Sequence, residues 1–394
     1  MRSLTVIMAI TIGLTGGILT VSLMQGIVNQ RLDIAIESEV SHLQIHNPDY
    51  LMNPELMTNI ENADSIIKRV KGIPGVTMVV KRTRVPVMIN TARTSTGVNI
   101  VGVEPENERK ISTLYKNVAD TSGSFFGEVK PNQIVISKKL ADKLKAKLKS
   151  KVVLTFQDTS GNLVGGAFKI TGIFKTSNSL LDESTAFITY DDFIRLTGLP
   201  HTSAHEIAIR VGTMEQIPVV QDTLKKMLPK LSVQNWKQIQ PELAVLVDWM
   251  GFMNFMIIGI ILLALGFGIL NTMLMAVLEL VKEIGMLMAI GMSRAKIFSM
   301  IMLESLFLSI IGGIVGTLIS LILVHLLNHN GVDFGAYSQA FERLGYPSLV
   351  YPAIPSEFFI GLTILVFLTG ILSAVYPARR ALKLNPVEVL RSDT

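Results

Sequence analysis

The sequence predicts an α-helical membrane domain of four transmembrane helices together with a large extracytoplasmic α+β domain. Three observations predict this fold class. Of the 394 residues, 49% are hydrophobic and only 17% are charged, whereas a soluble domain usually has about 25% charged residues. Four stretches are long and apolar enough to span a bilayer. A polar region of domain size, residues 27–248, separates the first stretch from the other three.

The four apolar stretches are residues 4–24, 250–278, 297–327 and 358–376. As a helix, the first covers about 31 Å at 1.5 Å per residue, close to the thickness of one hydrocarbon core. Its apolar core is too long for a signal peptide, and no small-x-small cleavage site follows. We therefore expect residues 1–26 to be retained as the first transmembrane helix, with the other three helices in a domain of residues 249–394.

The lysines and arginines predict the orientation in the membrane. With the N-terminus inside, the first residues, the loop 279–296 and the tail 378–394 are cytoplasmic, and they contain Arg2, Lys282, Arg294, Lys296, Arg379, Arg380, Lys383 and Arg391. The short outer loop, residues 328–357, contains only Arg343. Because short cytoplasmic loops are enriched in lysine and arginine, we expect both termini in the cytoplasm and residues 27–248 outside.

The polar region begins and ends with helical stretches, residues 27–40 and 236–248, which we interpret as stalks that extend the membrane helices outward. Between them a βαβ-like pattern occurs twice, in residues 42–89 and 206–236. We predict two subdomains within residues 27–248. A porter-like one comprises residues 30–101 and 205–240, and the second, residues 102–204, is inserted into it.

No pattern predicts catalysis. The sequence lacks G-x-x-x-x-G-K-[ST], G-x-S-x-G and H-E-x-x-H, so we expect no enzymatic activity and no ATP hydrolysis by this chain. Cysteine is absent, which excludes thiolate sites. Six histidines form three i,i+4 pairs without the glutamate of a zinc peptidase, at 42/46, 201/205 and 325/329, and we predict no metal or cofactor. The net charge of +5 is too small and too dispersed to predict a nucleic-acid partner.

Polar and small residues interrupt the apolar stretches at informative places. Glu304 lies about 10 Å past the cytoplasmic start of the third stretch, and inserting an acid at a helix centre costs on the order of 3 kcal/mol. We favour a structural interhelical bond for it over a coupling contact with Arg379 or Arg380. Gly312 and Gly316 have the spacing that lets helices approach closely. Packing within the subunit and packing against a partner subunit remain equally open.

The inner loop, residues 279–297 (ELVKEIGMLMAIGMSRAKI), is too apolar for a simple solvated turn. Apolar or small residues recur at helical spacing, and charged residues mark both ends. We predict a short amphipathic helix parallel to the membrane. Such a helix either lies on lipid or inserts into a groove on a cytoplasmic partner.

Several segments resemble one family. EIGMLMAIGMSRAKI (283–297), LES (303–305) and GGIVG (312–316) resemble the coupling loop and third helix of MacB/FtsX-type ABC permeases. YPARRALKLNPVEVLR (376–391) resembles the C-terminal signature of that family. SHLQIH (41–46) and QIVISKKLADKL (133–144) resemble the outer domain of its lipoprotein-releasing, LolC/LolE-like branch. One departure is that only Met1 and Arg2 precede Ser3, where the family usually has a basic amphipathic stretch.

The resemblance implies a non-enzymatic permease of the bacterial inner membrane, with a MacB-like periplasmic core domain and an FtsX-like permease domain. It implies a second permease copy or a homologous permease as partner, and a separate cytoplasmic ABC ATPase that binds ATP and Mg. By match to the family's coupling loop, the residues that contact the ATPase are Glu283, Ile284, Gly285, Ala289, Ile290, Gly291 and Arg294.

In that family, closing of the ATPases moves the outer domain through the stalks, a process called mechanotransmission. In the lipoprotein branch this movement releases lipoproteins toward a periplasmic carrier, and this is the function that we favour. Each CH₂ of a lipid chain that is buried in a membrane stabilises binding by about 0.8 kcal/mol, so an acylated protein does not leave a membrane unaided. Two alternatives remain: MacB-like export of peptides or drugs, and an FtsX-like signalling subunit that controls a cell-wall hydrolase.

Overall fold

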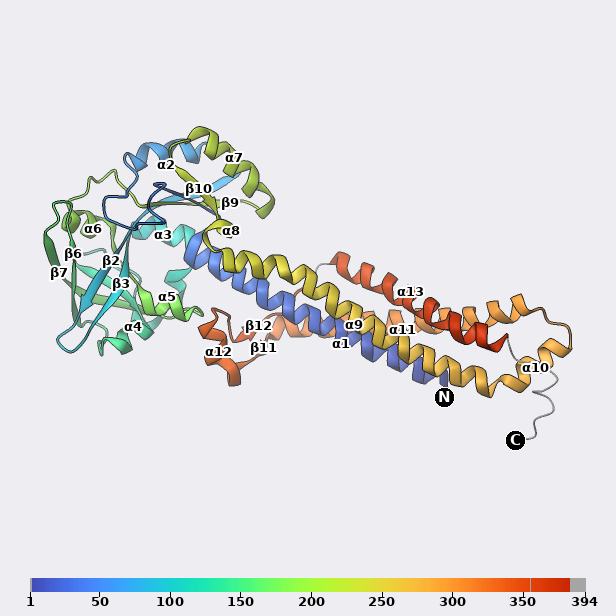
Figure 1. Ribbon diagram of the computed structural model, residues 1–394. Coiled ribbons are helices and arrows are strands. Elements are labelled where there is room, and N and C mark those ends of the chain that lie inside the picture. Colours follow the sequence, from blue (N-terminus) through green and yellow to red (C-terminus); the bar gives the residue numbers. More distant parts are fainter. Residues whose placement is uncertain (1, 355, 383–394) are drawn as a thin grey trace. The chain divides into compact units, whose positions relative to one another are not determined.

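A computed structural model describes residues 2–354 and 356–382 (Figure 1). The chain forms two compact units. We call residues 1–29, 247–334 and 349–394 the membrane unit, and residues 30–246 and 335–348 the sheet unit. The C-terminal part of the signature at 376–391, from residue 383 onward, lies outside the described residues.

The membrane unit is helical. Within the described residues, four helices are long and apolar enough to cross a membrane: α1 (Arg2–Ile34), α9 (Pro241–Glu279), α11 (Arg294–Asn330) and α13 (Ser356–Ala381). A short helix, α10 (Val281–Ala289), joins α9 to α11, and β11 (Val332–Asp333) pairs with β12 (Leu349–Val350). The predicted four-helix layout is therefore confirmed.

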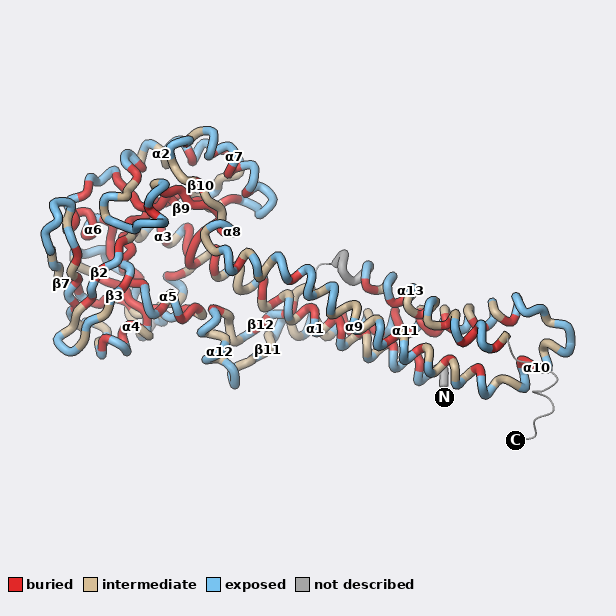
Figure 2. Tube along the Cα trace, viewed as in Figure 1, coloured by how far each residue is buried: buried red, intermediate tan, exposed pale blue. Residues whose placement is uncertain are grey.

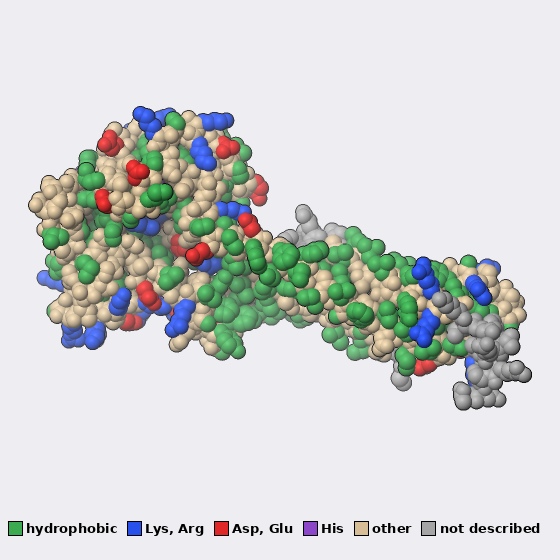
Figure 3. All heavy atoms as spheres, viewed as in Figure 1, with side chains coloured by type: hydrophobic (Ala, Val, Ile, Leu, Met, Phe, Trp, Pro, Cys, Tyr) green, Lys and Arg blue, Asp and Glu red, His purple; other side chains and the backbone are tan. Residues whose placement is uncertain are grey.

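The four helices pack through one apolar stripe each. Ile10 and Leu14 of α1, Ile269 of α9, Ile301 of α11 and Val366 of α13 belong to a single buried cluster. The opposite faces expose leucine, isoleucine and phenylalanine, and hydrophobic side chains dominate the visible surface of these helices (Figure 3). An apolar outer surface is stable in lipid and unfavourable in water.

The sheet unit contains ten strands in one sheet. The strands are β1 (Leu43–His46), β2 (Val76–Asn90), β3 (Ser95–Val103), β4 (Val118–Gly123), β5 (Gln133–Ser137), β6 (Lys151–Gln157), β7 (Leu163–Phe174), β8 (Thr185–Thr189), β9 (Glu206–Val211) and β10 (Ser232–Asn235). The helices are α2 (Ala63–Lys71), α3 (Pro105–Ile111), α4 (Lys138–Lys143), α5 (Ser179–Ser184), α6 (Tyr190–Thr197), α7 (Ile217–Met227), α8 (Trp236–Ile239) and α12 (Ser338–Arg343). The remaining helical segments are one π-helical segment, η1 (Ala35–Val40), and the short 3-10 helices η2 (Leu114–Asn117), η3 (Met214–Gln216) and η4 (Gly335–Tyr337).

Part of the sheet closes on itself. Pairing runs from β2 through β3, β8, β5, β7 and β6 and back to β2, which makes a ring of strands. Alternation along β2 points Val85, Val87 and Ile89 into the ring, where they join Phe168 and Phe193 in the main core cluster. The same alternation leaves Arg84, Pro86 and Met88 on the outer face of β2. The buried interior is visible as red segments in Figure 2.

The rest of the sheet is open. Its order is β10–β1–β9–β2, with β2 shared between this part and the ring. The units β1–α2–β2 and β9–α7–β10 correspond to the two βαβ-like patterns seen in the sequence. The sheet is continuous across the boundary that we predicted at residue 102, because β3 spans it and pairs with β2 along its length.

The predicted stalks have defined ends. Helix α1 ends at Ile34 and is followed by a π-helical segment, η1 (Ala35–Val40). On the return path, α8 ends at Ile239, and α9 begins at Pro241. The outer loop predicted at residues 328–357 is shared between the two units, because residues 335–348 belong to the sheet unit and the residues on either side belong to the membrane unit.

Candidate functional site

Helix α10 lies in the loop for which we predicted an amphipathic helix. Ile284 and Gly285 are buried, and Ile284 belongs to the same apolar cluster as Ile297 and Ile301. Leu287 is half-buried. One side of α10 is therefore held against the membrane helices that it connects, which fixes its position.

The other side of α10 presents an apolar edge. Ile290 is 79% exposed and Met286 is 54% exposed, and Ala289 between them is also exposed. The chain then turns at Gly291, whose φ of +101° favours glycine, before α11 begins at Arg294. Burying an isoleucine side chain is worth about 1.5–3 kcal/mol, so this edge gains stability when a partner or lipid covers it.

The structure sorts the predicted coupling residues into two groups. Glu283, Ala289, Ile290, Gly291 and Arg294 are exposed. Ile284 and Gly285, in contrast, lie on the buried side of the helix. Any partner of this loop would meet the first group, while the second group anchors the helix.

Glu304 lies on an exposed part of α11. Among residues 2–354 and 356–382, no ion pair joins it to Arg379 or Arg380. Arg380 Nη1 instead lies 3.4 Å from the hydroxyl oxygen of Tyr376. Within the same ranges Glu304 forms no interhelical hydrogen bond either, so neither the bond that we favoured nor the alternative contact is found among the described residues.

Gly312 and Gly316 face α1 of the same chain. A Cβ on Gly312 would lie 2.9 Å from Ile10 Cβ, and one on Gly316 would lie 3.2 Å from Thr11 Cα. The hydroxyl of Thr11 donates to the Gly312 carbonyl oxygen at 3.3 Å. The two glycines therefore permit close packing of α11 on α1.

Within the sheet unit, a buried carboxylate accepts hydrogen bonds from residues of both stalks. Glu39 of η1 accepts hydrogen bonds from Arg31 Nη1 at 3.0 Å, Asn178 Nδ2 at 2.8 Å and Gln240 Nε2 at 2.7 Å. Its side chain is only 6% exposed. Arg31 belongs to the outgoing stalk, Gln240 lies in the returning stalk directly before α9, and Asn178 caps α5. We call these four residues the Glu39 joint.

A second cluster crosslinks the open part of the sheet. Arg82 of β2 donates to Glu108 of α3 at 2.7 Å and to Glu206 of β9 at 2.8 Å. All three side chains are at most 5% exposed. Despite burial, the two carboxylates keep the pKa of Arg82 above its ordinary value. Burial also opposes ionisation of Glu206, but the charges of Arg82 and Arg84 hold the pKa of Glu206 below its ordinary value. This ionic cluster fixes α3 and β9 on β2.

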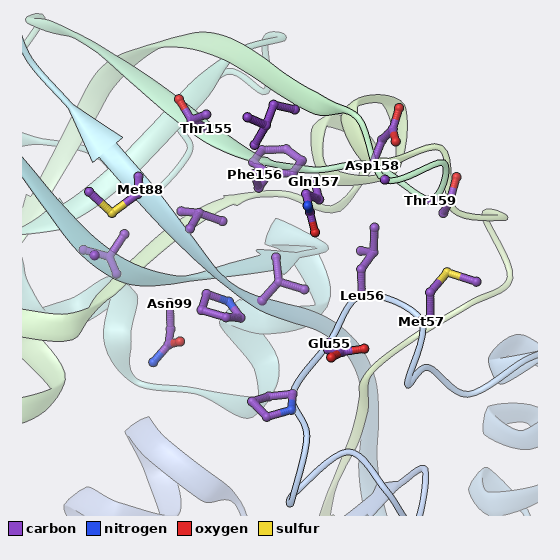
Figure 4. A pocket seen from close by; sticks show the side chains of 18 of the residues that line it. Glu55, Leu56, Met57, Met88, Asn99, Thr155, Phe156, Gln157, Asp158 and Thr159 are labelled. Carbon is purple, nitrogen blue, oxygen red and sulfur yellow. The ribbon is translucent and has the colours of Figure 1, made fainter.

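A groove of about 740 Å³ runs over the outer face of the ring (Figure 4). Its walls are the loop at residues 54–57 and the hairpin at residues 157–163. Met57, Met88 and Leu163 line it and are 62%, 45% and 76% exposed. Gly97 pairs with Met88 across the two strands and places no side chain in the groove. The groove therefore combines exposed apolar side chains with polar ones, and its methionines are flexible side chains that adapt to varied apolar ligands.

The histidines pair differently from their sequence spacing. His46 and His205 come from different pairs, yet each packs on Tyr50, with ring centroids 5.3 and 5.5 Å apart. Burial lowers the pKa of His205 to about 4 and also lowers that of His46. We therefore interpret these neutral imidazoles as packing residues that stabilise the fold. Within the described ranges, no three His, Asp or Glu side chains gather as metal ligands.

Sequence reasoning missed Glu39, Arg82, Arg84 and the groove residues. The alternation of β2 contains part of the signal, because VKRTRVPVM places Arg82, Arg84 and Met88 on one face. Arg31 lies eight positions from Glu39, but the other two partners, Asn178 and Gln240, lie 139 and 201 positions away. No local pattern reveals contacts at such separations.

Comparison with known proteins agrees with this architecture. Residues 3–227 match the MacB-like periplasmic core domain, and residues 255–386 match the FtsX-like permease C-terminal domain. The uncharacterized ABC transporter permease YknZ of Bacillus subtilis is 25% identical over 99% of this chain and 95% of its own length. The macrolide export ATP-binding/permease protein MacB of Neisseria meningitidis is 26% identical over 57% of this chain but only 34% of its own length.

A third relative is the lipoprotein-releasing system transmembrane protein LolC of Neisseria meningitidis, 22% identical over 98% of this chain and 92% of its own length. Among solved structures, the extracellular domain of YknZ aligns with 49% of this chain at 18% identity and a TM-score of 0.35. The core-domain match alone covers more than half of the sequence. Four membrane-spanning helices, an α+β outer domain and these two family matches show that the chain belongs to the MacB/FtsX-type family of ABC transporter permeases.

Proposed function

We propose that this permease transmits the movement of a separate cytoplasmic ABC ATPase to its outer domain. The observation that carries the proposal is the exposed apolar edge of α10, where Ile290 is 79% exposed beside charged residues. An apolar ridge with charged flanks suits a groove on a protein partner. The buried side of α10 is part of the same cluster as the membrane helices, so force applied to α10 reaches those helices directly.

The outer end of the force path is the Glu39 joint. Helices α1 and α9 are 33 and 39 residues long, and rigid helices transmit displacement without much bending. The joint binds residues of both stalks to one carboxylate of the sheet unit. A relative shift of the stalks therefore strains the hydrogen bonds between Glu39 and its partners Arg31, Asn178 and Gln240. Through Asn178, this strain displaces the outer domain.

We further propose that the cargo is a lipoprotein, released from the inner membrane toward a periplasmic carrier by a complex with a second permease copy or homologous permease. Two observations support this. The LolC relative aligns along nearly the entire chain, and the groove lined by Met57, Met88 and Leu163 offers apolar surface for acyl chains or apolar segments. In this proposal both termini lie in the cytoplasm, and the sheet unit lies in the periplasm.

The coupling proposal is tested by Ile290→Asp and Gly291→Trp in the complex co-purified with its ATPase. We expect either variant to lose ATPase binding or to uncouple ATP hydrolysis from transport, because a charge or a strained bulky side chain disrupts the α10 edge. Val219→Asp is the matched control, since Val219 is 69% exposed on α7 of the sheet unit. A complex that binds the ATPase and transports normally with both α10 variants would refute the proposal.

The cargo proposal is tested by depleting the chain in cells and following the fractionation of lipoproteins. Retention of lipoproteins in the inner membrane is the expected result. Normal sorting on depletion would refute lipoprotein release. Increased drug or peptide sensitivity would then favour export, and a defect in cell-wall hydrolysis would favour the signalling role.

A further inference from the structure

A cavity of about 580 Å³ lies within the sheet unit, beside the Glu39 joint. The stalk residue Arg31, strand β2, helix α5, the first turns of α9 and residues 344–346 all contribute to its lining. Its walls combine polar groups with leucines, which is the lining expected for an amphiphile. Nothing in the coupling path described above requires such a cavity.

Arg31 and Arg84 are the arginines of this cavity, and Arg84 is the one without an ion pair among the described residues, although it lies close enough to Glu206 to help lower the pKa of that carboxyl. Arg82, two residues earlier on the same face of β2, is saturated by two carboxylates, and Arg31 is paired with Glu39. In the part of the chain that the structure describes, no carboxylate lies within ion-pair distance of the Arg84 guanidinium, and its Nε atom is buried without a hydrogen-bond partner. A partly buried guanidinium without a partner favours an anionic ligand, best of all a phosphate or carboxylate.

Gln240, which also lines the cavity, provides a hydrogen-bond acceptor that complements the positive charge of Arg84. Its Nε2 donates to Glu39 at 2.7 Å, which fixes the orientation of the amide. Its Oε1 is buried and has no partner among the described residues. Glu242 also lines the cavity and is exposed. An acceptor and a nearby carboxylate on this wall favour a ligand that carries a donor, such as an ammonium group.

The leucines indicate what else the ligand contains. Leu180 and Leu344 line the cavity and are 71% and 68% exposed. Leu246 is also in the lining. A ligand that contacts these leucines together with Arg84 and Gln240 has polar and apolar ends.

We propose that the cavity binds the headgroup of a zwitterionic glycerophospholipid of the phosphatidylethanolamine type. The phosphate lies against Arg84, the ammonium group faces Gln240 Oε1 and Glu242, and the glycerol with the first acyl carbons contacts Leu180 and Leu344. A lipid held beside the Glu39 joint would stabilise the hydrogen bonds of that joint. This inference is independent of the identity of the cargo and of the ATPase.

Native mass spectrometry of the full chain, purified in a phosphate-free glycoside detergent, tests the proposal. The probes are dihexanoyl-phosphatidylethanolamine, inorganic phosphate and dihexanoylglycerol. We expect the phospholipid to bind, and inorganic phosphate or the phosphate-free diglyceride to bind at least about tenfold more weakly, since each lacks one half of the recognition. Arg84→Met should weaken phospholipid binding about tenfold or more.

Arg93→Met is the matched control, because Arg93 is exposed at the β2–β3 turn and does not line the cavity. Leu344→Asp changes an exposed wall residue without touching a strand and should also weaken binding. Arg84→Lys, which keeps the charge, should retain part of it. The proposal is overturned if Arg84→Met and Leu344→Asp bind the phospholipid as well as Arg93→Met. It is equally overturned if inorganic phosphate alone, or the diglyceride alone, binds as tightly as the phospholipid.

Discussion

Gln240 donates a hydrogen bond to Glu39 at 2.7 Å, although 201 positions separate the two residues. Glu39 follows the outgoing membrane helix, and Gln240 directly precedes the returning one. The contact therefore ties residues of both stalks to a single carboxylate. Its physical consequence is that the stalks cannot separate without breaking buried hydrogen bonds.

Replacing Glu39 by Gln should uncouple ATP hydrolysis from transport. The amide cannot accept from Arg31, Asn178 and Gln240 together as a carboxylate does, and the loss of a charge-assisted buried bond costs about 1.5–3 kcal/mol. We expect the ATPase of the assembled complex to turn over while transport falls. Glu37→Gln is the control, since Glu37 pairs with Arg210 but is 40% exposed. Equal transport by both variants would remove the joint from the force path.

Replacing Arg82 by Met should destabilise the sheet unit by about 3–5 kcal/mol, because it leaves Glu108 and Glu206 buried without their counter-charge. Hydrogen exchange of β2 and β9 in the purified chain measures the effect. Lys138→Met provides the comparison, since the exposed Lys138–Asp142 pair is worth less than about 1 kcal/mol. Similar protection of the two strands in both variants would contradict the structural role of the ionic cluster.

Asp182 should make the sheet unit less stable as the pH rises. Burial raises the pKa of Asp182 to about 6 from an ordinary 3.8, even though Thr176 donates to its carboxylate. Because the folded state binds the proton more tightly, the free energy of unfolding falls between about pH 4 and pH 7. One pKa unit corresponds to about 1.4 kcal/mol, so the change is about 1–3 kcal/mol. Thermal unfolding across this range should show a decline in the wild type that Asp182→Asn lacks.

The buried histidines act in the opposite direction, and this separates the two effects. Burial lowers the pKa of His205 to about 4, so its contribution to stability is present above pH 6.5 and is lost as the pH falls toward 4. Asp182→Asn should leave that acid-side loss in place. If the variant and the wild type kept a constant difference in melting temperature from pH 4 to 7, the assignment of a raised pKa to Asp182 would be wrong.

Replacing Gly312 by Ala should weaken the packing of α1 on α11. The added methyl would lie 2.9 Å from Ile10 Cβ and 3.3 Å from the carbonyl oxygen of Ile7, and overpacking of this kind costs about 1–3 kcal/mol. Gly259→Ala is the matched control, because nothing lies within 4 Å of a Cβ there. Thermal stability in detergent should fall only for the first variant; equal melting temperatures would refute close packing at Gly312.

The sequence allowed much of this architecture to be predicted. Apolar runs revealed the membrane helices, because spanning a bilayer demands some twenty apolar residues in a row. Helical spacing revealed α10, and turn and strand patterns revealed the two βαβ-like units. The closed ring was not predictable, since it depends on β6 of one segment pairing with β2 of another. Glu39 and Arg84 were missed for the same reason: their environments are built from residues distant in sequence.

The central claim is that α10 faces the cytoplasm and receives an ATPase there. Because the chain contains no cysteine, Ile290→Cys creates a unique thiol whose reaction with a membrane-impermeant maleimide can be followed directly. We predict no labelling in intact cells, labelling in inside-out vesicles stripped of the ATPase, and protection when the ATPase is bound, with Val219→Cys labelled from outside as the control. Labelling of Ile290→Cys in intact cells, or unchanged labelling with the ATPase bound, would contradict the account.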